Sequence, residues 1–134
     1  MRTIIILLML VSVQVNAGDH KLGFGLFTEH YRSDDPRYNE NNRLLLYSYI
    51  NESNYSFTAA SFENSHFIDS QMVSAGYEFN ETFGVTLAAV NGYKTILDTH
   101  YKGLVFIPIL YLETFGFRHT IFGPAYNLSY VLKF

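Results

Sequence analysis

The chain has 134 residues, a net charge of −3 and no cysteine. The acidic balance provides no basic surface for nucleic acid, and the lack of cysteine excludes disulfides and a lipid-modified N-terminal cysteine. The sequence contains 12 Phe and 11 Tyr. Such a density of aromatic residues suits the two interface girdles of a membrane β-barrel.

The first 17 residues have the features of a signal peptide. Arg2 precedes an apolar run from Ile4 to Val13, and Val15 and Ala17 are the small residues that a signal peptidase inspects. The run is shorter than the roughly 20 apolar residues that a transmembrane helix needs. We therefore expect a signal peptide at 1–17 and an exported domain at 18–134.

The rest of the chain divides into eight strand-like segments of about ten residues, the length of a tilted transmembrane strand. Short polar turns alternate with longer loops at 32–42, 65–70 and 94–100, and only the connection at 123–124 breaks this trend. This asymmetry is typical of outer-membrane barrels. The predicted strands cover 21–31, 43–51, 55–64, 71–80, 83–93, 101–112, 115–122 and 125–134.

The C-terminal segment shows the strictest alternation in the chain. Tyr126, Leu128, Tyr130, Leu132 and Phe134 share one face of a strand. This pattern predicts the closing strand of a barrel with its apolar side toward lipid. The expected fold is all-β, an eight-stranded antiparallel up-and-down transmembrane β-barrel in the outer membrane of a Gram-negative bacterium. A secreted soluble barrel or sandwich is the alternative.

The sixth predicted strand is apolar on both faces between Leu104 and Leu112. This predicts an apolar interior on one side of the barrel, either as packed core or as a pocket for a hydrocarbon chain. Pro108 lies in the middle of the segment and lacks the N–H for a ladder hydrogen bond, so the sheet is expected to open or bulge there.

Side chains able to carry chemistry gather near the outward ends of the strands. His30 ends the first strand, and Asn64 and Ser65 follow the third. A histidine, a serine and an amide on one rim could form an acyl-transfer site, although an ordinary solvated rim has the same composition. His100 and His119 show no ligand spacing, so no metal site is expected.

Several motifs together resemble a known family. Phe27-Thr-Glu-His30, Arg37-Tyr-Asn-Glu40, Phe62-Glu-Asn-Ser65, the strand interrupted by Pro108 and the aromatic C-terminus occur in the same order in the lipid A palmitoyltransferases. Members of that family are eight-stranded outer-membrane barrels that move a palmitoyl chain from a glycerophospholipid to lipid A and hold the chain in their lumen. The resemblance extends over nearly all of 18–134. It implies a catalytic histidine at His30, a serine at Ser65, the place of the family's aspartate at Asn64, and no cofactor.

The chain departs from the family pattern in three places. It lacks the N-terminal amphipathic helix, its loop after His30 is shorter, and Asn64 replaces the aspartate. An amide can orient an imidazole but has no negative charge to stabilise an imidazolium. By strict alternation His30 shares the face of Leu22 and Phe24, and Ser65 shares that of Tyr55 and Phe57. This predicts that both lie at the outer rim on the lipid side.

The remaining candidate residues are assigned to substrate binding or to loop ordering. Arg37 and Glu40 could bind lipopolysaccharide phosphates, directly or through divalent cations, whereas Tyr38, Asn39 and Glu40 could brace the rim. Pro108 is expected to lie beside the apolar pocket that would hold the acyl chain.

The expected function is acyl transfer from a phospholipid to lipid A. With water as acceptor, the same site would be a phospholipase or deacylase; the alternative outside the enzymes is a barrel that binds or masks lipopolysaccharide or a surface receptor. The expected partners are lipopolysaccharide, phospholipid and the barrel assembly machinery, with the chain a monomer in the membrane.

Overall fold

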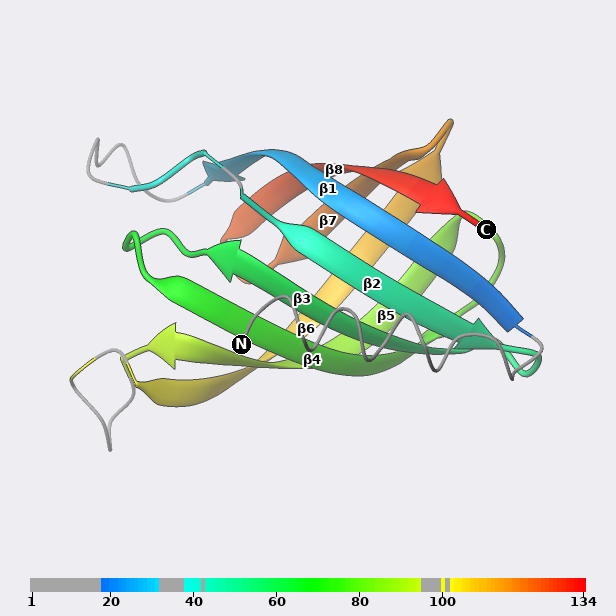
Figure 1. The fold of residues 1–134 in the computed structure, drawn as a ribbon, viewed down its shortest axis with the longest axis horizontal. Helices are drawn as coiled ribbons and strands as arrows, with labels where there is room; N and C mark the ends of the chain where they lie inside the picture. Colours follow the sequence, from blue (N-terminus) through cyan, green and yellow to red (C-terminus); the bar gives the residue numbers. More distant parts are fainter. Residues whose placement is uncertain (1–17, 32–37, 42, 95–99, 101) are drawn as a thin grey trace.

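The computed structural model describes residues 18–31, 38–41, 43–94, 100 and 102–134, so the expected signal peptide and Arg37 lie outside the described residues. The described chain forms eight β-strands (Figure 1). They are β1 (Gly18–His30), β2 (Leu45–Asn51), β3 (Tyr55–Glu63), β4 (Asp69–Glu78), β5 (Phe83–Tyr93), β6 (Gly103–Thr114), β7 (Phe117–Phe122) and β8 (Ala125–Lys133).

The strands form a closed antiparallel barrel, in which each strand pairs with its neighbours in sequence and β1 pairs with β8. The predicted all-β fold, the strand number and the up-and-down order are confirmed. One end of the barrel, here called the inner end, carries the start of β1, the C-terminus and the three tight turns, on the right in Figure 1. The opposite, outer end carries the longer connections. Within the described residues, no helix is long and apolar enough to cross a membrane.

Period-two alternation separates the two faces of the wall, as the sequence predicts. In β8, Tyr130 and Leu132 are exposed on the outside, whereas Asn127, Ser129 and Val131 are buried in the lumen. The same alternation in the other strands gives the exterior a continuous apolar cover. Its exposed members include Phe24, Phe27, Tyr55, Phe57, Val73, Tyr77, Phe79, Leu87, Leu104, Phe106, Leu110, Leu112 and Ile121.

The turn between β6 and β7 differs from the prediction. The sequence places it at Glu113 and Thr114, but both residues pair within the sheet, and the turn is formed by Phe115 and Gly116. Both turn residues have positive φ, 51° and 81°, as a two-residue type I′ hairpin requires. Phe115 is fully exposed. The polar Glu113 therefore predicted the turn at the wrong position, because its side chain forms ion pairs inside the lumen.

A β-bulge in β1 overturns the predicted side for His30. The pairing of β1 with β8 shifts between Gly25 and Phe27, so that Leu26 has no partner of its own. Beyond the bulge Thr28 pairs with Asn127 and His30 with Ala125. Residues that pair directly point to the same face of a sheet, and both partners are buried in the lumen. His30 therefore faces the lumen rather than the lipid side.

Pro108 lies where β6 pairs with β5 alone. Toward β5 the register is regular, with Leu87 opposite Pro108, and the irregularity lies instead between Val90 and Tyr93. Toward β7 the pairing ends at Ile109 and Phe122, one residue from the proline. The predicted opening is therefore wrong for the β5 side, and on the β7 side the pairing stops because β7 itself ends at Phe122.

The lumen has two layers. The outer half contains an apolar core of Ala88, Val90 and Ile109, packed against Phe62, Met72, Tyr93, Val105, Ile107 and Phe122. The inner half contains buried charged side chains from β1, β4, β6 and β7. The apolar inward face predicted for β6 is confirmed.

Candidate functional site

A cavity of about 90 Å³ lies in the outer half of the lumen. Its mouth is polar and includes His30, Asn39, Asn64 and Ser65, so the structure places three of the predicted catalytic positions around one space. Ser65 lines the lumen here, so its predicted place on the lipid side is wrong, as it is for His30. Below the mouth the wall is apolar, whereas the end toward the inner half is polar. The polar residues at that end are Thr58, Ser74, Thr86, Tyr111, Arg118, Thr120 and Asn127. The apolar lining residues are Leu44, Leu46, Phe62, Met72, Val90, Ile107, Ile109 and Phe122.

The bulge in β1 and a ring contact together hold His30 at this mouth. The imidazole stacks on the ring of Tyr38, with 5.0 Å between the ring centroids and 18° between the planes. Its Nδ1 atom is buried and has no hydrogen-bond partner among the described residues. An unpaired buried nitrogen is costly, so this atom is available to a group that enters the site.

Tyr38, Asn39 and Glu40 form a short bridge between β1 and β3. The backbone N–H of Thr28 donates to the carbonyl of Glu40 at 3.1 Å, and the N–H of Asn39 donates to the carbonyl of Ser65 at 3.0 Å. The bridge therefore lies between β1 and β3 at the outer end, beyond the start of β2. It links the segment that carries His30 to the segment that carries Ser65.

The Asn39 side chain strengthens this bridge from a buried position. Asn39 is 5% exposed, and its Nδ2 donates to Glu63 Oε1 at 2.8 Å. Its Oδ1 accepts from the N–H of Asn41 at 3.0 Å. Asn39 thus holds the end of β3 and its own loop in a single arrangement.

Asn64 is committed to the turn between β3 and β4. Its Nδ2 donates to Ser70 Oγ at 3.0 Å and to the Gly92 carbonyl at 2.8 Å. Its Oδ1 accepts from the N–H groups of His66 and Ile68 at 2.8 and 3.1 Å. Two donors and two acceptor sites are all that an amide offers, so in this conformation Asn64 has nothing left to orient His30.

His30 and Ser65 both contact the bridge formed by residues 38–40, through the Tyr38 ring and the backbone N–H of Asn39 respectively. In the described part of the chain, no hydrogen bond connects their side chains. Tyr38 also contacts His66, with ring centroids 5.6 Å apart, and His66 contacts Tyr93 at 6.5 Å. An aromatic row that includes His30 therefore crosses the mouth of the cavity.

The other candidate residues lie away from the cavity. Pro108 is exposed on the exterior, while its neighbours Ile107 and Ile109 line the space. His119 also faces outward, and its Nδ1 is 2.7 Å from the hydroxyl of Tyr126. Among the described residues, no group of three or more His, Asp or Glu side chains could hold a metal ion.

The sequence analysis missed the charged side chains of the inner half. Lys21, Glu78, Glu113 and Arg118 are buried and joined by ion pairs. The available signal was their inward parity in strands that otherwise bury small or apolar residues. That signal indicates where each side chain points but not which partner it meets across the lumen.

Comparison of this chain with protein-family models and with curated proteins found no match. The likeness to the lipid A palmitoyltransferases therefore rests on the motifs alone.

Proposed function

We propose that the chain is an outer-membrane acyltransferase that moves an acyl chain from a phospholipid to lipid A. One observation carries this proposal: His30 and Ser65 lie at the mouth of one cavity whose wall directly below the mouth is apolar. A nucleophile and a base at the entrance of an apolar space suit a reaction at the head of a hydrocarbon chain.

The exterior supports placement in a bilayer. Large apolar side chains are exposed around the barrel on every strand but β2, whereas soluble monomers rarely expose extended apolar surfaces. Two outward histidines are hydrogen-bonded to tyrosine hydroxyls, His20 to Tyr47 at 2.8 Å and His119 to Tyr126 at 2.7 Å. Polar groups at membrane depth need such internal partners.

The proposed reaction has two steps. The Ser65 hydroxyl attacks the ester carbonyl of the phospholipid, His30 accepts the serine proton and passes it to the departing glycerol oxygen, and an acyl-serine and a lysophospholipid result. A lipid A hydroxyl then attacks the acyl-serine, giving its proton to His30, and the serine is released with its own proton restored. One ester replaces another, so the reaction needs no cofactor.

The site must rearrange before it can react. A long acyl chain exceeds the cavity of about 90 Å³, since a cavity of about 150 Å³ admits only a molecule such as benzene. Met72, a flexible side chain that adapts its shape, lines the space and can move aside. Between Gly103 and Pro108, β6 has no ladder to β7, so the wall has few hydrogen bonds to lose on that side. Catalytic hydrogen bonds that are long in a resting enzyme often form only with substrate bound.

The test is mass spectrometry of lipid A from cells that express the chain. We expect a mass increase of one acyl chain, lost in His30→Ala and in Ser65→Ala. Glu29→Ala is the matched control, because Glu29 adjoins His30 but faces the exterior. Release of lysophospholipid without acylated lipid A would instead indicate a phospholipase. Unchanged lipid A, with the folded barrel in the membrane, contradicts the proposal.

One observation favours a second candidate, a barrel that binds or masks lipopolysaccharide without chemistry. The amide of Asn64 is used entirely by the local turn, so His30 has no orienting partner there. For such a barrel, lipopolysaccharide binding should be equal in wild type, His30→Ala and Ser65→Ala.

A further inference from the structure

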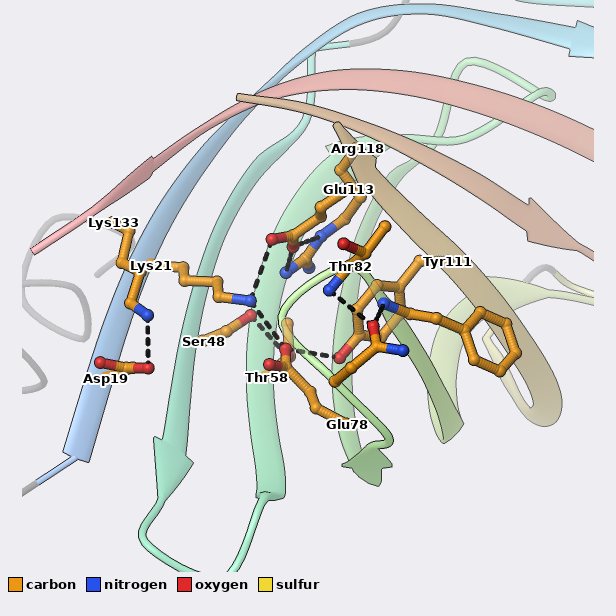
Figure 2. A network of polar contacts seen from close by, with 12 residues as sticks. Asp19, Lys21, Ser48, Thr58, Glu78, Thr82, Tyr111, Glu113, Arg118 and Lys133 are labelled. Carbon is orange, nitrogen blue, oxygen red and sulfur yellow. Dashed lines mark hydrogen bonds and ion pairs between the residues drawn. The ribbon is translucent and has the colours of Figure 1, made fainter. Parts of the chain in front are cut away.

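Five side chains form a cross-link through the inner half of the lumen, here called the ionic septum. Lys21 donates to Glu78 at 2.8 Å and to Glu113 at 2.9 Å (Figure 2). Arg118 donates from Nε to Glu113 at 2.6 Å, and the Tyr111 hydroxyl donates to Glu78 at 2.8 Å. The septum thus joins β1, β4, β6 and β7 across the barrel.

The ionic septum lies between two cavities of very different size. Tyr111 and Arg118 line the outer cavity of about 90 Å³. Lys21, Glu78 and Glu113 line a polar cavity of about 620 Å³ at the inner end. Each side chain on the outer side bonds directly to a carboxylate on the inner side. These contacts therefore lie between the two spaces.

The chemistry of the ionic septum differs from that of an ordinary core. Its two cations and two carboxylates balance, and the Arg118 guanidinium also lies 4.4 Å from the centre of the Tyr111 ring. Burying ions is costly, and an apolar filling of the same volume is often at least as stable. Lys21 divides its contacts between two carboxylates, and Glu113 divides its own between two cations. The Lys21–Glu113 contact can therefore break and still leave two pairs, Lys21 with Glu78 and Arg118 with Glu113, so that no ion is left alone.

We propose that the ionic septum is a gate for small inorganic ions, closed in the arrangement seen. When Lys21 releases Glu113 and keeps Glu78, the two cavities join into one path through the barrel. This inference rests on the proposed position in the membrane but not on acyl transfer, so either can fail without the other.

The test is electrical recording from the refolded domain 18–134 in a planar lipid bilayer with potassium chloride on both sides. Wild type should be closed for most of the recording. Glu113→Gln keeps the size of the side chain but removes the charge that Lys21 and Arg118 share. We expect its open fraction to rise about tenfold or more, the shift that losing one strong contact produces in a two-state equilibrium.

Asp19→Asn is the matched control. It makes the same change from carboxylate to amide in the same inner cavity, but Asp19 pairs with Lys133 at 2.6 Å outside the septum. Its open fraction should equal that of wild type. Lys21→Met gives a second septum variant in case Glu113→Gln does not fold, with folding checked by heat-dependent gel mobility.

A rise in the septum variants alone supports the gate. Folded septum variants that are as silent as wild type overturn it, and so does an equal rise in Asp19→Asn, which would indicate a general leak.

Discussion

Asn64 donates a hydrogen bond from Nδ2 to the carbonyl oxygen of Gly92, 2.8 Å away, and so ties the end of β3 to β5. The same nitrogen donates to the hydroxyl of Ser70 on the intervening β4. A carboxylate only accepts, so it could not bond to the Gly92 carbonyl, and it could keep the contact with Ser70 only if that hydroxyl turned to donate. The amide at this position, which departs from the family's aspartate, therefore matches the local structure of this barrel.

The first prediction is that Asn64→Asp lowers the free energy of unfolding. The loss should be about 1–3 kcal/mol, the usual cost of leaving buried partners unpaired. Urea-induced unfolding of the barrel refolded in lipid vesicles measures it. Asn51→Asp is the control, since the Asn51 side-chain oxygen accepts from the N–H groups of Ser53 and Tyr55, and a carboxylate keeps that role. Equal losses in the two variants would contradict this account.

The second prediction concerns Gly92, the partner of Asn64. Its φ is 88°, and a Cβ there would lie 2.3 Å from Ser70 Oγ. Gly123 also has a positive φ, 54°, but a Cβ there would meet nothing within 4 Å. Both Gly→Ala changes incur the left-handed backbone cost of about 1–2 kcal/mol. Gly92→Ala should add about 1–3 kcal/mol of overpacking, seen as a clearly lower melting temperature than that of Gly123→Ala. If the two variants melt together, the turn is looser than described.

The strands could be predicted because a barrel wall imposes a period of two along its whole length. The segment at 83–93 was predicted with the bounds that β5 has in the structure. The outward Tyr130 and Leu132 and the inward Asn127 and Ser129 follow directly from parity. Such patterns require only that the two faces of each strand meet different surroundings.

Contacts across the lumen could not be predicted in this way. Lys21 and Glu113 are 2.9 Å apart although 92 positions separate them in the chain. Their meeting depends on how far each strand is offset from its neighbours around the closed barrel. Alternation within a strand carries no information about that offset.

The third prediction compares two lysines at the inner end. Lys21 is 4% exposed and pairs with two carboxylates, so Lys21→Met leaves Glu78 and Glu113 without this cation. We expect a loss of about 3–5 kcal/mol, as for other broken buried pairs. Lys133 pairs with Asp19, and both are about half exposed. Lys133→Met should therefore cost less than about 1 kcal/mol. Chemical unfolding of both variants measures the difference, and similar losses would show that water screens the septum.

The face of the barrel wall on which His30 lies depends on the extra residue Leu26, which a strict period-two pattern does not predict. Up to Phe24, β1 keeps strict alternation against β8, but Leu26 is an extra residue in the ladder. A bulge adds one residue on one strand and exchanges the faces of all that follow. Gly25 next to Leu26 is a weak sign of such a bulge, and the apolar run through Phe27 conceals it.

The fourth prediction follows from the bulge and tests it directly. The chain has no cysteine, so Glu29→Cys and His30→Cys each provide a single thiol for a nitroxide spin label. Glu29 is exposed on the exterior, whereas His30 is half-buried at the cavity mouth beside Tyr38. We expect a mobile electron paramagnetic resonance spectrum for the label at 29 and an immobilised one at 30. Adding Tyr38→Ala should make the label at 30 mobile and leave the label at 29 unchanged, because only the label at 30 lies against the Tyr38 ring. An immobile label at 29 with a mobile one at 30 would mean that β1 runs without the bulge and that His30 faces outward.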